Sequence, residues 1–242
     1  MTQNIYDDET FFAGYSCLRR SVEGLDGAPE WPALRALLPP LAGTTVLDLG
    51  CGFGWFCRWA RDNGADRVLG VDVSEKMLAR GRATTADAAI TYVRADLEQL
   101  ALARESFDLA YSSLALHYVA DLGALLAAVH RALVPGGRLV FSVEHPIYTA
   151  PRDARWSVDA TGRKTWPVDS YLQEGARITD WLAPGVVKQH RTVASYINAL
   201  LQAGFTLAHV EEWGPTDAQI AERPELAVER DRPAFLLVAA RR

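Results

Sequence analysis

The feature that most constrains this chain is the stretch Val46–Gly54, which reads Val-Leu-Asp-Leu-Gly-Cys-Gly-Phe-Gly. Its mainly apolar start predicts a strand that is buried on both faces of a parallel sheet. Three glycines at alternate positions follow, and helical spacing begins at Trp55. A strand, a tight glycine turn and a helix together direct backbone N–H groups and a helix N-terminus at a ligand, which a Cβ would obstruct. We therefore expect a ligand site at residues 50–54.

The glycine spacing differs from the dinucleotide-binding fingerprint. That fingerprint is G-x-G-x-x-G, whereas Gly50, Gly52 and Gly54 form G-x-G-x-G, and Trp55 stands where the third glycine would fall. Asp48 adds a carboxylate near the end of the same strand. A carboxylate there would repel a pyrophosphate and favours a ligand that carries positive charge.

Two further acidic residues follow predicted strands. Asp72 ends the strand predicted at 68–72, and its two oxygens match the two hydroxyl donors of a ribose. Asp96 follows the strand predicted at 90–94, where it could also serve as the N-cap of a helix. The loop that begins at Ser112, after the next predicted strand, leaves the sheet beside the glycine turn.

Together these residues resemble the class I S-adenosyl-L-methionine (SAM) methyltransferases. The resemblance is nearest to the type-11 methyltransferase-domain family, which includes the ubiquinone and menaquinone methyltransferases. It covers residues 40–145 best and includes Pro135-Gly136-Gly137 before the fifth predicted strand. It implies an α/β, Rossmann-like fold: a seven-stranded, mostly parallel sheet with helices on both faces, a last strand antiparallel to strand five, and an insertion after strand five. SAM is the implied cofactor and S-adenosyl-L-homocysteine the implied product.

The resemblance also implies which residues bind the cofactor. Asp72 is expected to accept from the ribose hydroxyls, Asp96 from the adenine amino group, and Gly52 to border the methionine part. The full expected set is Tyr15, Asp48, Gly50, Cys51, Gly52, Asp72, Val73, Met77, Asp96, Leu97 and Ser112.

Two histidines are candidate catalytic residues. His117 lies in the loop after the fourth predicted strand, and His145 follows the fifth. A histidine, with an ordinary pKa of about 6.5, is a natural base for a hydroxyl acceptor. Packing or substrate orientation is the alternative for both, because holding the acceptor and the methyl group close, dry and in line supplies much of the acceleration.

We expect one domain over residues 1–242 with two additions. Residues 1–38 are expected to cap the cofactor, through an amphipathic helix that includes Phe11 and Tyr15. Residues of about 145–191 carry several aromatic side chains and a predicted hairpin around Ala183-Pro184-Gly185. In related enzymes such an insertion often forms a substrate lid. The alternative is a hydrophobic cluster that only supports the loop.

Composition sets the remaining expectations. The net charge is −5 and there is no long basic run, so no nucleic-acid partner is expected. No stretch approaches the roughly 20 apolar residues of a membrane span. Cys17, Cys51 and Cys57 lack metal-ligand or disulfide-framework spacing, which predicts no metal and a cytoplasmic location. The oligomeric state stays open between monomer and homodimer.

The predicted function is methyl transfer from SAM to a small-molecule substrate, by O-, N- or C-methylation. The loop after strand four reads Ser-Ser-Leu-Ala and lacks the Asn/Asp-Pro-Pro-Tyr/Phe motif of methyltransferases that act on nucleic-acid bases or glutamine. Two alternatives remain. An NAD(P)-dependent oxidoreductase would share Asp72 but leaves Asp96 without a task, and a non-catalytic SAM-binding protein would lack an acceptor cavity.

Overall fold

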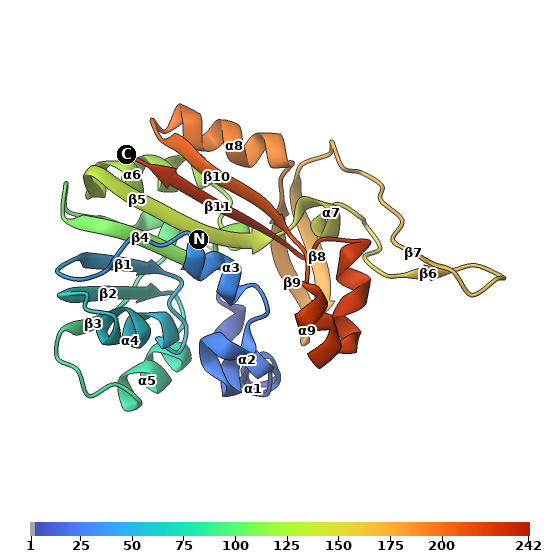
Figure 1. Ribbon diagram of the computed structural model, residues 1–242, viewed down its shortest axis with the longest axis horizontal. Helices are drawn as coiled ribbons and strands as arrows, with labels where there is room; N and C mark the ends of the chain where they lie inside the picture. Colours follow the sequence, from blue (N-terminus) through green and yellow to red (C-terminus); the bar gives the residue numbers. More distant parts are fainter. Residues whose placement is uncertain (1–2) are drawn as a thin grey trace.

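The computed structural model describes residues 3–242 and centres on a seven-stranded sheet (Figure 1). The strand order is β10-β11-β5-β4-β1-β2-β3. The strands are β1 (Thr45–Leu49), β2 (Arg67–Asp72), β3 (Ile90–Arg94), β4 (Phe107–Ser113), β5 (Leu133–Glu144), β10 (Thr206–Trp213) and β11 (Phe235–Arg241). β11 pairs antiparallel with β5 and β10, and the remaining pairs are parallel. The predicted α/β, Rossmann-like fold class is confirmed.

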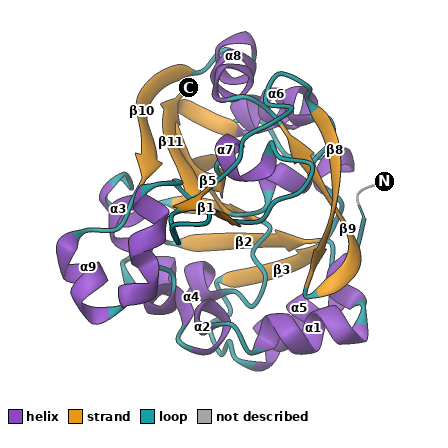
Figure 2. Cartoon of the chain, turned by 90° about the vertical axis from the view of Figure 1, so that its right-hand side faces the viewer, coloured by secondary structure: helices purple, strands orange, loops and turns teal. Residues whose placement is uncertain are grey.

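Helices cover both faces of this sheet (Figures 1 and 2). Alternate strand residues point to opposite faces, so each strand feeds two hydrophobic layers. Val46 packs in one layer with Trp31 and Phe56, and Leu47 packs in the other with Leu126 and Leu200. The helices concerned are α3 (Trp31–Ala36), α4 (Trp55–Asp62) and α5 (Glu75–Ala83) on the first face, and α6 (Leu122–Ala132) and α8 (Val193–Gln202) on the second. Among residues 3–242, no helix is long and apolar enough to cross a membrane.

The N-terminal segment forms a helical cap that packs on a distant hairpin. It comprises η1 (Ile5–Asp7), α1 (Glu9–Ser16), α2 (Arg19–Val22) and η2 (Gly24–Gly27). Phe11 is fully buried and forms a small hydrophobic cluster with Ala183 and Val186 of the hairpin. The Phe11 and Trp181 rings meet edge to face with 5.4 Å between centroids. The cap therefore adjoins the insertion as well as the sheet.

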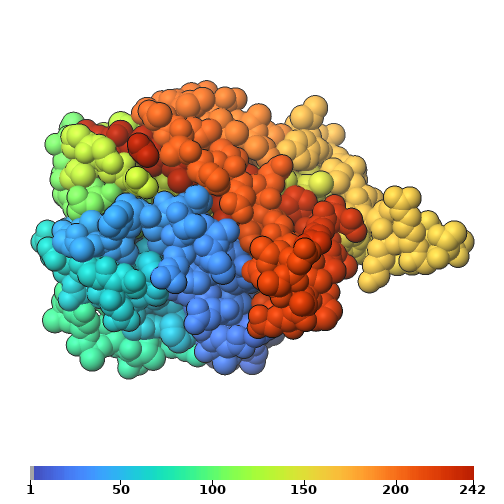
Figure 3. Space-filling view, viewed as in Figure 1, coloured from blue at the N-terminus to red at the C-terminus, as the bar shows by residue number. Residues whose placement is uncertain are grey.

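The insertion after β5 contains α7 (Pro146–Thr149), β6 (Ser157–Val158), β7 (Lys164–Thr165), β8 (Gly175–Trp181) and β9 (Ala183–His190). β8 and β9 form the predicted hairpin, but the chain reverses at Leu182, which has φ +60°. Pro184 and Gly185 instead lie inside β9, where the register shifts opposite Asp180. The Pro-Gly pair thus accommodates a bulge instead of the turn. In Figure 3 the segment around β6 and β7 projects from the body.

The segment between β10 and β11 is helical. It contains α9 (Asp217–Glu222) and η5 (Pro224–Arg230). Thr216 and Gln219 form a capping box, which explains why α9 begins there. Gln219 Nε2 donates to Pro29 O at 2.7 Å, so this segment lies against the N-terminal part of the chain (Figure 3).

Candidate functional site: the cavity at the carboxyl ends of the strands

A cavity of about 310 Å³ opens at the carboxyl ends of the parallel strands. Its wall includes Gly50 after β1, Asp72 at the end of β2, Ser113 at the end of β4 and Glu144 at the end of β5. This edge is where open α/β sheets bind their ligands, because the loops that leave adjacent strands diverge there.

The glycine turn forms the floor of the cavity. Gly50 has φ +77°, and a Cβ there would lie 2.3 Å from the Cβ of Ala115, so the two loops can approach only with glycine at this position. Gly52 has φ +52° and no heavy atom within 4 Å of where a Cβ would lie. Because Gly52 lines the cavity, that open space is available to a ligand.

Asp72 links the end of β2 to the glycine turn. Its Oδ2 accepts from Gly52 N at 2.9 Å and its Oδ1 accepts from Ser74 N at 2.9 Å. Burial raises the pKa of the Asp72 carboxyl to about 6, although these backbone donors oppose the shift. Each oxygen retains a second lone pair, so the side chain can still accept two ligand hydroxyls.

Most of the expected cofactor residues come together at the cavity. Asp96 is in its wall and is also the N-cap of η3 (Leu97–Gln99), with Oδ1 accepting from Glu98 N at 3.0 Å. The sequence-derived candidates found in the wall are Tyr15, Gly50, Gly52, Asp72, Val73, Met77, Asp96, Leu97 and His117.

Three expected cofactor residues, Asp48, Cys51 and Ser112, lie behind the cavity wall. Asp48 is buried and accepts a hydrogen bond from Cys57 Sγ at 3.2 Å, and burial raises the pKa of its carboxyl to about 7. Ser112 is fully buried, and its Oγ donates to Leu49 O at 2.7 Å. Cys51 is buried with its backbone N bonded to Val71 O. These groups support the glycine turn from below, and residues 113–115 line the cavity in place of Ser112.

His117 lines the cavity as a neutral hydrogen-bond donor. It lies in η4 (Leu116–Tyr118), and burial lowers the pKa of its imidazole to about 4. Its Nδ1 accepts from the backbone N–H of Glu144 at 3.4 Å. The remaining proton is therefore assigned to Nε2, which leaves no free lone pair for base catalysis.

His145 does not lie in the cavity wall with His117. Its Nδ1 accepts from Ile147 N at 3.0 Å, so the ring caps α7. Its Nε2 lies 2.9 Å from Glu212 Oε1 on β10, and burial lowers the pKa of the imidazole. These two contacts direct the ring toward the insertion and β10.

A second group of wall residues comes from the N-terminal cap, the loop after β4, the end of β5, the insertion and the C-terminal segment. The cap and the insertion were expected near the site, but the sequence analysis missed Tyr118, Glu144, Glu229, Arg232 and Phe235. Glu144 pairs with Lys188 of β9, at 2.5 Å between Oε1 and Nζ. Arg232 pairs with Glu229, at 2.7 Å between Nη2 and Oε1. The wall residues in this group include Tyr6, Arg20, Tyr118, Glu144, Tyr148, Trp181, Glu229, Arg232 and Phe235. Local spacing carries no signal for the missed residues, because only tertiary folding brings the loop after β4, β5 and the C-terminal segment to the insertion.

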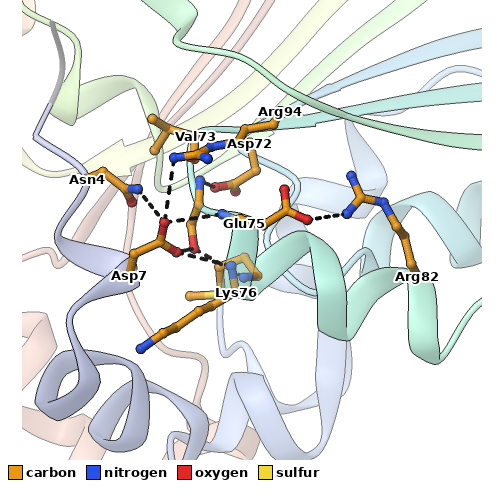
Figure 4. A network of polar contacts seen from close by, with 10 residues as sticks. Asn4, Asp7, Asp72, Val73, Glu75, Lys76, Arg82 and Arg94 are labelled. Atoms are coloured by element: carbon orange, nitrogen blue, oxygen red, sulfur yellow. Dashed lines mark hydrogen bonds and ion pairs between the residues drawn. The ribbon is translucent and has the colours of Figure 1, made fainter.

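Hydrogen bonds of Asp7 attach the N-terminal cap to the chain beside the cavity (Figure 4). Asp7 Oδ1 accepts from Ser74 Oγ at 2.6 Å and from Lys76 N at 3.1 Å, at the start of α5. Its Oδ2 accepts from Asn4 Nδ2 and lies 3.8 Å from Arg94 Nη2. Burial raises the pKa of Asp7, but the hydrogen bonds outweigh it and hold that pKa below its ordinary value.

Comparison with known proteins decides the family. Residues 47–141 match the methyltransferase domain family. An S-adenosylmethionine-dependent methyltransferase from Mesorhizobium loti, known from a crystal structure, is 66% identical and superposes with a TM-score of 0.88. The match covers 90% of this chain and 100% of that one. The chain belongs to the SAM-dependent methyltransferases.

Two further relatives show how much of the chain is similar to other proteins. A Haemophilus influenzae protein named only as uncharacterized is 34% identical over 99% of this chain and 97% of its own length. A malonyl-[acyl-carrier protein] O-methyltransferase from Enterobacter lignolyticus is 43% identical, but over 46% of this chain and 43% of its own length. The second similarity therefore leaves more than half of each protein unmatched.

SAM is the cofactor of this methyltransferase, and the alternative of an NAD(P)-dependent oxidoreductase is set aside. The cavity fits it, because a buried carboxylate at the end of β2 stands beside the open space at Gly52. The residues that would hold it are the wall residues on the glycine turn, β2, α5 and η3. When bound, SAM supplies a methyl group that is activated by a positively charged sulfur.

Proposed function

We propose that this methyltransferase methylates a small molecule that binds in the same cavity, between the cofactor residues and the insertion. The observation that carries the proposal is the composition of one continuous wall. It includes Gly52 and Asp72 from the sheet edge, and Tyr148 and Trp181 from the insertion. A cavity of about 310 Å³ is within the size range of small-ligand sites, roughly 300–1,000 Å³.

Residues of about 145–191 act in this proposal as a substrate lid, and the described residues of the predicted cap, 3–38, as a cap; residues 1–2 of that prediction lie outside the described residues. Tyr148 of α7 and Trp181 of β8 supply lid side chains to the wall, while Tyr6 and Tyr15 supply cap side chains. Trp181 joins the lid to the cap, since its ring meets Phe11 and Tyr15 of α1 edge to face. Together they exclude water and orient the acceptor.

Methyl transfer from SAM requires little acid–base catalysis by the protein. Transfer from a sulfonium needs the acceptor held close to the methyl group and in line with the bond that breaks. The neutral His117, through Nε2–H, serves to orient the acceptor in this proposal. A nearby group could still take a proton from a hydroxyl acceptor, whereas a neutral amine needs less help.

Substitution of Trp181 by alanine tests the placement of the acceptor. Calorimetry with S-adenosylhomocysteine measures the cofactor half, and release of S-adenosylhomocysteine from SAM, screened over a panel of small metabolites, identifies an acceptor. We expect the variant to bind S-adenosylhomocysteine like the wild type and to raise the KM of that acceptor about tenfold. Trp213→Phe is the matched aromatic control, because Trp213 is buried on β10 outside the cavity wall.

An unchanged KM for the acceptor in the Trp181 variant would place the acceptor site elsewhere. Failure of the wild-type protein to bind S-adenosylhomocysteine would also contradict the placement of the cofactor in this cavity.

A further inference from the structure

Among residues 3–242, the charged wall residues away from Asp72 and Asp96 are Arg20, Glu144, Glu229 and Arg232, and each of them has an opposite charge beside it. We call this the acceptor part of the cavity. Arg20 Nη2 lies 2.9 Å from Glu30 Oε1, Lys188 Nζ lies 2.5 Å from Glu144 Oε1, and Arg232 Nη2 lies 2.7 Å from Glu229 Oε1. An ionised acceptor would lose its hydration here without meeting an unpaired counter-charge on a protein side chain, which is costly. The charge pattern favours a neutral acceptor.

Two buried polar atoms of wall residues lack a hydrogen-bond partner within residues 3–242: Glu144 Oε2 and Arg232 Nε. The Arg232 guanidinium is compensated in another way, because its Cζ lies 4.4 Å from the Tyr148 ring centroid and 4.3 Å from that of Trp166. Glu144 Oε2 has no such compensation. A buried carboxylate oxygen without a donor is uncommon, and a ligand donor would satisfy it.

Glu144 is a wall residue whose side chain is held in place. It ends β5, and its own backbone N–H bonds to His117 Nδ1. Lys188 is almost fully buried, with Nζ 2.5 Å from Glu144 Oε1 and 4.8 Å from the Trp181 ring centroid, so it restrains one carboxylate oxygen and leaves the other. The ion pair therefore fixes the Glu144 side chain where β5 meets β9 of the lid.

The remaining wall of this part of the cavity is largely aromatic. Tyr6, Tyr118, Tyr148, Trp181 and Phe235 come from the cap, the loop after β4, the lid and β11. Rings of this kind suit a flat apolar body, against which they pack face or edge.

This inference rests on the function proposed above. We infer that the acceptor is a neutral molecule with a flat apolar body and an O–H or N–H group that donates to Glu144 Oε2. Glu144 is then the residue that selects the acceptor. Lys188 is a positioning residue that acts through Glu144 and neutralises its charge.

Matched probes test this selection without turnover. 2-Naphthol, 2-methoxynaphthalene and 2-naphthoate share one flat ring system and offer a neutral donor, no donor and a carboxylate. Their affinities for the protein saturated with S-adenosylhomocysteine are measured by ligand-observed NMR titration. We expect 2-naphthol to bind about tenfold or more tightly than either of the others, which is the scale of a hydrogen bond to a charged group.

Glu144→Gln should invert this preference. The variant leaves the Lys188 cation without its partner, so binding of 2-naphthoate should strengthen while binding of 2-naphthol weakens. The double variant Glu144→Gln/Lys188→Met carries neither charge and keeps the test valid if the single variant fails to fold. In the double variant the difference in affinity between 2-naphthol and 2-naphthoate should disappear. Glu105→Gln is the matched control, because Glu105 pairs with Arg242 outside the cavity wall.

The outcomes separate this inference from the proposed function. Binding of S-adenosylhomocysteine with equal or tighter binding of 2-naphthoate than of 2-naphthol by the wild type would overturn the inference alone. An unchanged ratio between the affinities for 2-naphthol and 2-naphthoate in both Glu144 variants would also overturn the inference alone. Absence of S-adenosylhomocysteine binding would overturn the proposed function itself.

Discussion

At the scale of single residues, burial decides which groups of the site carry charge. Asp48 shows this most clearly, because burial raises the pKa of its carboxyl to about 7 from an ordinary value of 3.8. The Cys57 thiol opposes the shift and Asp72 adds to it. Since the folded state holds the proton more tightly than the unfolded chain, this carboxyl favours folding below about pH 4. That contribution is lost as pH rises to about 7.

The first prediction follows from that sign. Asp48→Asn keeps an oxygen for the Cys57 thiol and removes the ionisation. We expect the free energy of unfolding of the wild type to fall relative to that of the variant between pH 5 and pH 8. A carboxyl of this kind is worth at most about 3 kcal/mol over that range. Urea unfolding at several pH values measures the difference, with the exposed Asp62→Asn as control. A pH-independent difference would contradict a buried, protonated Asp48.

The second prediction concerns His117, whose imidazole pKa is lowered to about 4 by burial. We expect ¹⁵N NMR of histidine-labelled protein to show a neutral ring with the proton on Nε2 throughout pH 5.5 to 8. His117→Ala should lower turnover more than it lowers SAM affinity, because only positioning of the acceptor is lost. A ring that titrates near pH 6.5, or that carries its proton on Nδ1, would restore the base role to this residue.

At the scale of elements, the β1–turn–α4 unit was predictable and the lid was predictable only in outline. Gly50, Gly52 and Asp72 stand at the expected places because strand, turn and helix are set by neighbouring residues. Asp48 and Ser112 were expected at the cofactor but face the core, because the side-chain direction at a strand end depends on tertiary packing. Glu144 and Arg232 were missed, since the ion-pair partner of Glu144 and the aromatic rings around Arg232 belong to other elements.

The third prediction concerns the glycine turn as an element. Gly52→Ala should weaken SAM binding strongly, because its Cβ enters the open space beside the cavity. Gly43→Ala is a close control: both glycines have positive φ and no atom within 4 Å of an added Cβ, but Gly43 lies outside the cavity wall. Both variants should lose a similar stability of about 1–2 kcal/mol from left-handed backbone strain. Calorimetry with SAM and thermal unfolding measure the two effects, and equal SAM affinities in both variants would reduce Gly52 to a turn residue.

At the scale of the whole molecule, three segments far apart in sequence close one cavity. The cap, the lid and the segment before β11 each contribute wall residues, and they meet around Phe11, Trp181 and Arg232. On the function proposed above, SAM and the acceptor enter between these segments. The hydrophobic cluster that joins the cap to the hairpin has three buried members, whereas the sheet layers have many more. Fewer buried apolar groups therefore hold the cap to the hairpin than hold the helices to the sheet, and polar contacts at Asp7 add to the attachment of the cap (Figure 4).

The last prediction follows from this attachment. Asp7→Asn replaces one acceptor oxygen with a donor and breaks part of the bonding to Ser74 and the start of α5, while the sheet is untouched. We expect S-adenosylhomocysteine to dissociate about tenfold faster, as measured by stopped-flow fluorescence, and amide exchange to rise in residues 5–22. Global stability should change by less than about 1.5 kcal/mol, because few buried groups are involved. Glu9→Gln, on the exposed side of α1, is the control. Unchanged dissociation with faster exchange would show that the cap opens without gating the cofactor, and unchanged exchange would show that Asp7 does not hold the cap.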